Sequence, residues 1–142
     1  MKRLPFLLAA AAFLAGCSLL GDSGDGASDV TFTTAKNSYL LGQTVTATLK
    51  NGSNQAVGYN LCFTALERRE GDEWISVGPS IWCQAFMALL KPGEKEQYGV
   101  ALVDSLDLSV GTYRLVTDVE IDGESVTLAT ESFGVSVVVQ QR

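Results

Sequence analysis

The sequence predicts an all-β domain, an antiparallel β-sandwich of seven or eight strands that begins at residue 29 and continues to residue 142. Apolar and polar residues alternate with a period of two from Asp29 onward, which is typical of half-buried strands. Turn residues interrupt this alternation about every 8–12 residues, the spacing of a sandwich. No segment of the domain has the periodicity of an amphipathic helix. A chain of 142 residues has room for one packed core, so we expect one domain.

The individual strands follow from where the alternation starts and stops. We expect strands at residues 30–34, 44–50, 57–69, 73–77, 96–103, 112–121 and 125–139. In the second of these, Val45, Ala47 and Leu49 should face the core, with the intervening threonines outward. We expect turns at residues 37–43, 51–54, 70–73 and 91–94 and at the Asp-Gly pair at 122–123. The first of these turns also carries apolar residues that would plug the interior. Residues 78–90 form a less regular stretch.

The N-terminus has the parts of a signal peptide, namely a basic start at residues 1–3 and an apolar run at residues 4–15 that is too short to span a bilayer. The following string, LAGC at residues 14–17, resembles the bacterial lipobox. This resemblance implies cleavage after residue 16 and attachment of a diacylglyceride and a further acyl chain, such as palmitate, to Cys17. Two or three acyl chains would hold the protein on the membrane. An unlipidated Cys17 is the alternative.

Residues 17–28 are rich in Gly, Ser and Asp, and we expect a flexible linker between the lipid and the domain. They include GDSG at residues 21–24, which looks like the surroundings of a serine protease nucleophile. The chain has no histidine, so Ser23 has no base to activate it and histidine metal ligands are excluded. If residues 1–16 are removed, the chain keeps 8 basic and 16 acidic residues, which makes nucleic acid a poor partner.

Cys62 and Cys83 form an even pair in a chain with an export signal, which favours a disulfide between them. Two separately buried thiols and a two-cysteine metal site are the alternatives. We expect no metal site elsewhere. Residues 118–124, DVEIDGE, open like a calcium-binding EF-hand loop, but its twelfth position is Ala129 instead of a bidentate glutamate. Asp118 and Glu120 are therefore interpreted as residues on a solvated strand face.

The string LSVGTYRL at residues 108–115 resembles the approach to strand F of immunoglobulin-like domains. There a tyrosine hydroxyl bonds back to the backbone, and Tyr113 would hold that place. Leu115 stands where antibody domains have a cysteine, so the antibody-type disulfide is absent. Together with GDEWISV at 71–77 and the residues at 89–102, these features resemble bacterial Ig-like domains found in lipoproteins, and also the sandwich of the bacterial intracellular proteinase inhibitor family. The first resemblance implies an Ig-like sandwich.

Residues 78–90 crowd aromatic and other apolar side chains into a stretch without clean alternation. Such residues on a loop can anchor a protein partner, and Trp82 and Phe86 are then the binding candidates. They can also plug the core beneath a long loop, which we favour, and Trp74 is likewise expected in the core.

These observations predict a lipid-anchored, non-catalytic binding or accessory module of the bacterial cell envelope, without a cofactor and with a protein partner that the sequence does not name. Ser18, directly after Cys17, resembles the residue that lets a bacterial lipoprotein travel to the outer membrane, which implies that location in a cell with two membranes. Inhibition of an envelope protease is the alternative function. An enzyme is not expected, because no nucleophile and base, metal ligands or phosphate-binding loop can be assembled.

Overall fold

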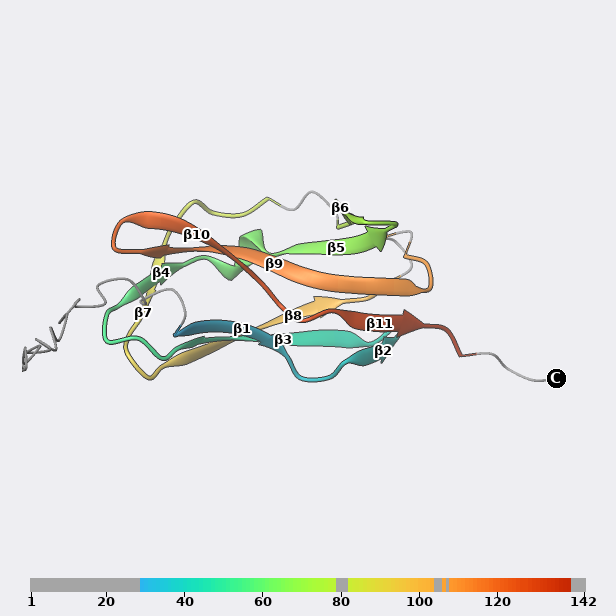
Figure 1. Ribbon diagram of the computed structural model, residues 1–142, viewed down its shortest axis with the longest axis horizontal. Helices are drawn as coiled ribbons and strands as arrows, with labels where there is room; N and C mark the ends of the chain where they lie inside the picture. The colour runs from blue at the N-terminus through green and yellow to red at the C-terminus, as the bar shows by residue number, and fades with distance from the viewer. Residues whose placement is uncertain (1–28, 79–81, 104–105, 107, 139–142) are drawn as a thin grey trace, which may run out of the picture.

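The computed structural model describes residues 29–78, 82–103, 106 and 108–138, which form two facing layers of β-strands (Figure 1). The predicted all-β sandwich is therefore confirmed. The strands are β1 (Val30–Thr34), β2 (Ser38–Leu40), β3 (Thr44–Asn51), β4 (Val57–Tyr59), β5 (Ala65–Glu70), β6 (Glu73–Ser76), β7 (Ala88–Leu90), β8 (Lys95–Ala101), β9 (Gly111–Ile121), β10 (Glu124–Ala129) and β11 (Phe133–Ser136), with one 3-10 turn, η1 (Leu61–Phe63). Within these described residues, no helix is long and apolar enough to cross a membrane.

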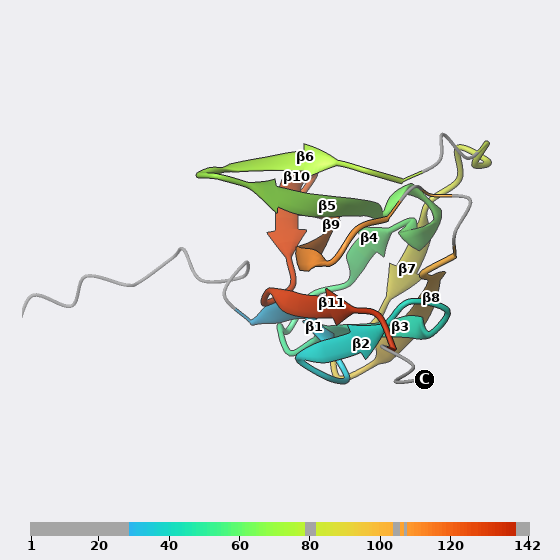
Figure 2. The same ribbon diagram turned by 90° about the vertical axis from the view of Figure 1, so that its right-hand side faces the viewer.

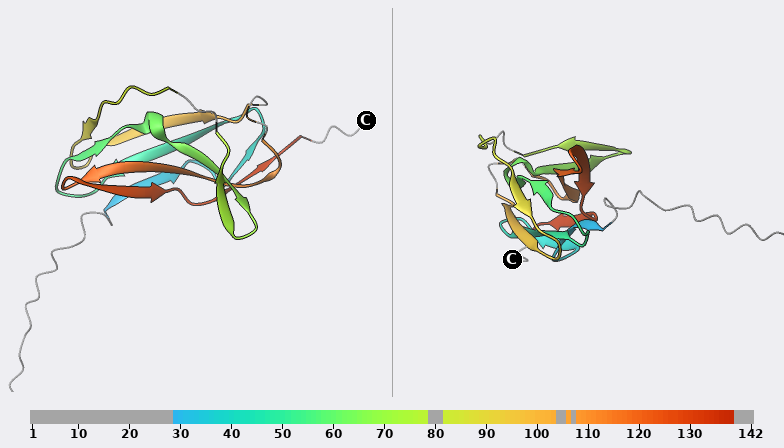
Figure 3. Two further views of the ribbon diagram at one scale, coloured as in Figure 1. Left: turned by 90° about the horizontal axis from the view of Figure 1, so that it is seen from above. Right: turned by 90° about the vertical axis from the view of Figure 1, so that its left-hand side faces the viewer.

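The two sheets differ in size. The smaller has the order β1-β3-β8, and the larger has the order β2-β11-β9-β4-β7, with β10 and β5 also paired to β9 and β6 paired to β5. The hairpin of β5 and β6 projects beyond the rest of the sandwich (Figure 3). All pairs are antiparallel except β2 with β11, which is parallel.

Residues 37–43, expected to be a turn, contain strand β2. The chain leaves β1 in the smaller sheet and enters β2, which lies beside β11 of the larger one (Figure 2). In this ladder Tyr39 stands opposite Val135. The turn prediction failed because three residues are too few to show a period, and because their partner strand lies almost a hundred residues away in the sequence. The crossing closes one side of the sandwich.

The interior follows the predicted alternation. Val45, Ala47 and Leu49 of β3 are fully buried and belong to the same core as Leu115 of β9, which is also fully buried. On the closed side the core is aromatic: the ring of Phe133 lies edge-on to Tyr39 at 5.3 Å and stacked on Tyr113 at 6.3 Å. The predicted inward face of residues 44–50 is confirmed.

Tyr113 makes the predicted hydrogen bonds near the start of β9. Its hydroxyl donates to the Ser109 carbonyl at 2.6 Å and accepts from the Ser109 amide at 3.2 Å, while its ring is fully buried. This tyrosine corner ties the chain before β9 to the strand itself.

Two predicted long strands are interrupted. Residues 57–69 split into β4 and β5, because Tyr59 pairs with Val119 and Ala65 with Val116, so three extra residues are inserted on this side and are accommodated by η1. Residues 125–139 split into β10 and β11, which leave one extra residue opposite β9 and so form a bulge. The predicted Asp122-Gly123 turn is confirmed, since both residues have positive φ, as a two-residue hairpin requires.

Asn51, at the end of β3, is a fully buried amide that joins the two sheets. Its Nδ2 donates to the Leu90 carbonyl at 2.8 Å and the Gln55 carbonyl at 2.7 Å, and its Oδ1 accepts from the amide and hydroxyl of Ser53 at 3.0 and 2.6 Å. Both N–H groups of the side-chain amide donate a hydrogen bond, and its oxygen accepts two.

Candidate functional site

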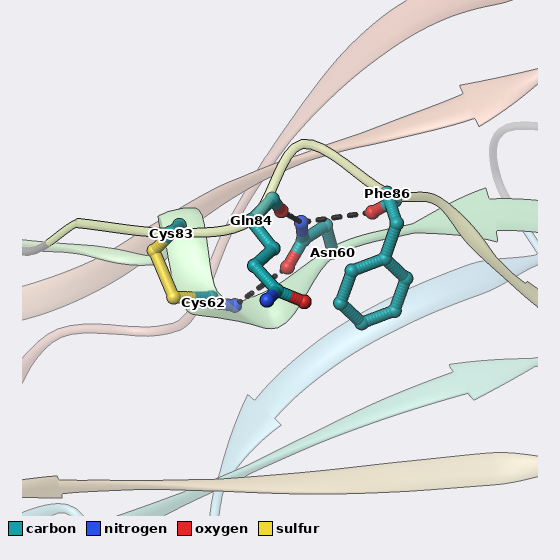
Figure 4. Close-up of a disulfide and its surroundings, with 5 residues drawn as sticks. All are labelled: Asn60, Cys62, Cys83, Gln84 and Phe86. Carbon is teal, nitrogen blue, oxygen red and sulfur yellow. Dashed lines mark hydrogen bonds between the residues drawn. A yellow bond between two sulfur atoms is a disulfide. The ribbon is translucent and has the colours of Figure 1, made fainter.

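A disulfide joins Cys62 in η1 to Cys83, so the predicted bridge is confirmed (Figure 4). It fastens the segment that follows Cys83 to the 3-10 turn beneath it. The bridge belongs to the larger sheet, because η1 lies between β4 and β5. It thus differs from a bridge that would connect two facing sheets.

Asn60 holds the same segment at two further points. It is the N-cap of η1, where its Oδ1 accepts from the Cys62 amide at 3.2 Å. Its Nδ2 donates to the carbonyl oxygens of Gln84 and Phe86 at 2.8 and 2.9 Å (Figure 4). One side chain therefore caps η1 and fixes the backbone after Cys83. Asparagine is a common N-cap, but the sequence held no signal for the bonds to Gln84 and Phe86.

Residues 82–90, here called the anchored segment, end in strand β7, which pairs with β4. Trp82 is 83% exposed, Phe86 61%, Met87 53% and Leu89 69%, whereas Leu90 is buried. The core-plug prediction is therefore wrong for Trp82 and Phe86. The reason is that Leu61 of η1, together with Val57 and Val119 of the strands beneath, already fills the interior, so the segment passes outside it.

Met87 lies on the outer face of β4, over Gly58. A Cβ atom at Gly58 would clash with the Met87 sulfur. Leu89 stands opposite Gly58 in the ladder of β4 and β7. The glycine thus leaves space for the Met87 side chain, and the apolar surface of the anchored segment extends onto the sheet.

A cleft of about 640 Å³ opens between the two sheets beside the anchored segment. One wall is η1 and the start of β5, with the disulfide at its rim, and the other is β8 with Val103 and Leu106. Phe63, which is 56% exposed, lines it. The Oγ1 atoms of Thr64, in this wall, and Thr117 are buried and have no hydrogen-bond partner within the described residues. Neither the cleft nor Phe63 was predicted from the sequence.

Tyr59 and Glu96 connect the two sheets. The Tyr59 hydroxyl on β4 donates to Glu96 Oε2 on β8 at 3.4 Å. Burial raises the pKa of the Tyr59 hydroxyl, and the Glu96 carboxylate raises it further by its charge and by this hydrogen bond. Tyr59 therefore stays protonated and acts as a donor between the sheets.

Trp74, expected in the core, is half-buried on the projecting hairpin, so that prediction is wrong. Its ring stacks under the Arg114 guanidinium at 4.3 Å, and Arg114 Nε lies 2.7 Å from the Glu67 carboxylate. The β5–β6 hairpin extends past the edge of the interior, so Trp74 packs on Arg114 of the neighbouring strand β9 instead. Arg68 on the same hairpin pairs with Glu70, and this hydrogen bond raises the pKa of its guanidinium.

The acidic face of β9 is solvent-exposed, as predicted. Asp118 and Glu120 are exposed, and Asp118 accepts a hydrogen bond from Thr127 on β10. No group of three or more Cys, Asp or Glu residues that could hold a metal ion occurs in the part of the chain that the structure describes. The predicted lipidation site Cys17, the signal peptide and the linker lie outside the described residues.

The model of a family described as a bacterial Ig-like domain matches residues 26–132. No curated protein matches the sequence. Among solved structures, the chain is similar to the alkylpurine DNA glycosylase AlkC of Pseudomonas fluorescens, with 12% identity, 76% of this chain and 30% of that chain covered and a TM-score of 0.38. It is also similar to the sporulation control protein Spo0M of Bacillus subtilis, with 19% identity, 79% and 49% covered and a TM-score of 0.42. The chain spans less than half the length of each.

Proposed function

We propose that this chain, which belongs to the family of bacterial Ig-like domains, is a non-catalytic binding module that engages a protein of the bacterial cell envelope through its anchored segment. The observation that carries the proposal is the exposure of Trp82, Phe86, Met87 and Leu89 on a backbone held by a disulfide and by Asn60. Exposed apolar residues that gather in one place are characteristic of interaction surfaces.

Fixing the segment favours binding because less conformational freedom is lost when a partner associates. Three connections, the bridge at Cys83 and the two bonds from Asn60, hold the backbone between residues 83 and 86. Large aromatic side chains in the centre of an interface commonly contribute most of its affinity. Trp82 and Phe86 flank this held backbone and are the proposed anchors.

The module would be tethered to the membrane by lipid on Cys17. The linker at residues 17–28 could extend about 40 Å, at roughly 3.3 Å per residue, so the domain could reach partners well clear of the bilayer surface. The outer membrane is the proposed site in a cell with two membranes. The mature unchanged protein should partition into detergent, and replacement of Cys17 by Ser should abolish the acyl mass and block normal cleavage. A processed, membrane-bound Cys17→Ser protein would contradict the tether.

Photo-crosslinking in the bacterium of origin tests the binding surface. A photoreactive phenylalanine analogue is placed at position 82, 86 or 110 of the full-length chain. Val110 is the matched control, because it is as exposed as Phe86 but lies outside the anchored segment. We expect one protein adduct of the same mass from positions 82 and 86 and none from 110. The absence of adducts at 82 and 86, or equal adducts at all three positions, would refute the proposal.

A companion measurement separates binding from folding. Trp82→Ala and Phe86→Ala should leave the melting temperature nearly unchanged, because both side chains are mostly exposed. In cells, each should reduce the yield of the adduct formed from the other position. Inhibition of an envelope protease, the alternative function, would instead yield a protease in the adduct whose activity falls in a one-to-one ratio with added protein.

A further inference from the structure

Strand β8 has a free edge. Within the described residues it pairs only with β3. At one end of that ladder the Leu102 amide donates to the Gln43 carbonyl at 2.9 Å. Hydrogen-bonded and non-bonded pairs alternate in an antiparallel ladder, so Ala101 and Gly99 direct their N–H and C=O groups away from β3.

The C-terminal part of this edge lacks the features that usually protect an edge strand. Gly99 and Ala101 are exposed, and their outward backbone groups have no hydrogen-bond partner in the described part of the chain. Natural edges carry charges, proline or a bulge, or are very short. Strand β8 spans seven residues, and its last five, residues 97–101, contain no charge and no proline. Such a strand can accept another strand.

The cleft lies directly beside the free edge. All four residues 98–101 of β8 line it, with the larger side chains coming from Tyr98 and Val100, and Cys83 brings the anchored segment to it. Because side chains alternate along a strand, every second side chain of a strand added to β8 would enter the cleft. Gly99 and Ala101, whose side-chain positions alternate with those of Tyr98 and Val100, present almost no side chain, so the other side chains of the added strand would meet no obstruction. A strand that pairs with the β8 backbone is therefore also positioned to place alternate side chains in the apolar cleft.

We infer that an extended segment of the partner protein adds to β8 as a further strand and inserts apolar side chains at alternate positions into the cleft. This inference rests on the proposed binding function and specifies what the partner contributes. The chain is acidic, with 16 acidic against 10 basic residues before any cleavage and 8 basic after removal of residues 1–16, so the segment that it favours is flanked by Lys or Arg. The same charge opposes pairing of two copies of this chain at their β8 edges.

Phage-displayed random dodecapeptides, selected on the full-length protein held by its N-terminus, test the inference. We expect the selected peptides to carry apolar residues at alternate positions with basic flanks. Ala101→Pro removes the outward amide of residue 101 without removing a bond to β3, and should weaken their binding at least tenfold. Val110→Ala is the control and should bind as the unchanged protein does. In the unchanged protein, the peptides should slow hydrogen exchange of the Gly99 and Ala101 amides, a readout that needs no variant.

Three results would overturn the inference: no selected peptide, peptides that bind Ala101→Pro equally well, or unchanged exchange at Gly99 and Ala101. A concentration-dependent dimer that Ala101→Pro abolishes would assign the edge to a second copy instead. If crosslinks form at positions 82 and 86 while the peptides ignore Ala101→Pro, the binding module stands and the added strand fails. If the peptides require the β8 edge but no crosslinks form at positions 82 and 86, the added strand stands and the proposed role of the anchored segment fails.

Discussion

Replacement of Tyr113 by Phe removes one oxygen from the interior and leaves the ring in place. The hydroxyl makes two hydrogen bonds to Ser109, one as donor to the carbonyl at 2.6 Å and one as acceptor from the amide at 3.2 Å. At about 0.5–1.5 kcal/mol for each bond, the variant should lose about 1–3 kcal/mol of unfolding free energy. No cavity term is added, because the fully buried ring keeps its packing against Phe133.

Tyr39→Phe is the matched comparison. The Tyr39 ring is also buried and lies against Phe133, but within the described residues its hydroxyl makes a single hydrogen bond, accepted from the Lys36 amide at 3.1 Å. It should therefore cost about half as much as Tyr113→Phe, roughly 1 kcal/mol. Urea unfolding of both variants, with equal slopes against denaturant, measures the two values. A change at Tyr113 of less than about 0.3 kcal/mol, or one smaller than that at Tyr39, would refute the assignment of these bonds.

Three further variants test other parts of the sandwich. Asn51→Leu leaves the Leu90 carbonyl and the Ser53 amide without hydrogen-bond partners, at about 1–3 kcal/mol each. Urea unfolding should therefore show a loss of about 2–6 kcal/mol of unfolding free energy. The exposed control Asn54→Leu should lose almost none. The double variant Cys62→Ala/Cys83→Ala removes a bridge between residues 21 positions apart and should lose about 3 kcal/mol of unfolding free energy in the chain-entropy model. A loss below about 1 kcal/mol would argue against that model. The pKa of Tyr59 is raised above 10.0 in the folded protein, so unfolding releases its proton above pH 10 and stability falls as pH rises through the folded value. Stability should therefore fall more steeply above pH 10 in the unchanged protein than in Tyr59→Phe, and equal slopes would contradict the raised pKa.

Local patterns predicted the parts of the fold that local chemistry decides. The bounds of β1 match the expected strand, and β3 and β9 match within one residue at each end, because alternation of apolar residues is a property of the strand alone. Asp122 and Gly123 form the expected turn because few other residues tolerate positive φ there. Tyr113 and the Cys62–Cys83 bridge were found from a resemblance and from cysteine number.

Features that depend on register between distant strands were missed. The three residues inserted at η1 and the single bulge between β10 and β11 appear only when each strand is paired with β9. The insertion at η1 also explains why the site was seen only in part. It brings Cys62 and Asn60 under the anchored segment and lets the cleft form beside Phe63, although each residue alone has an ordinary local pattern. Trp74 and Trp82 were expected inside because apolar character does not reveal which residues the core has room for.

The two sides of the sandwich differ in a way that separates stability from binding. On one side the chain crosses from β1 to β2, pairs in parallel with β11, and closes the interior with the rings of Tyr39, Phe133 and Tyr113. On the other side, β8 keeps a free edge, the cleft stays open, and the bridge and Asn60 hold exposed apolar residues beside it. Changes at sites that share no partners usually add. Tyr113→Phe should therefore lower stability without altering the adducts formed at position 82, whereas Trp82→Ala should weaken binding without altering stability, and the double variant should show both effects unchanged.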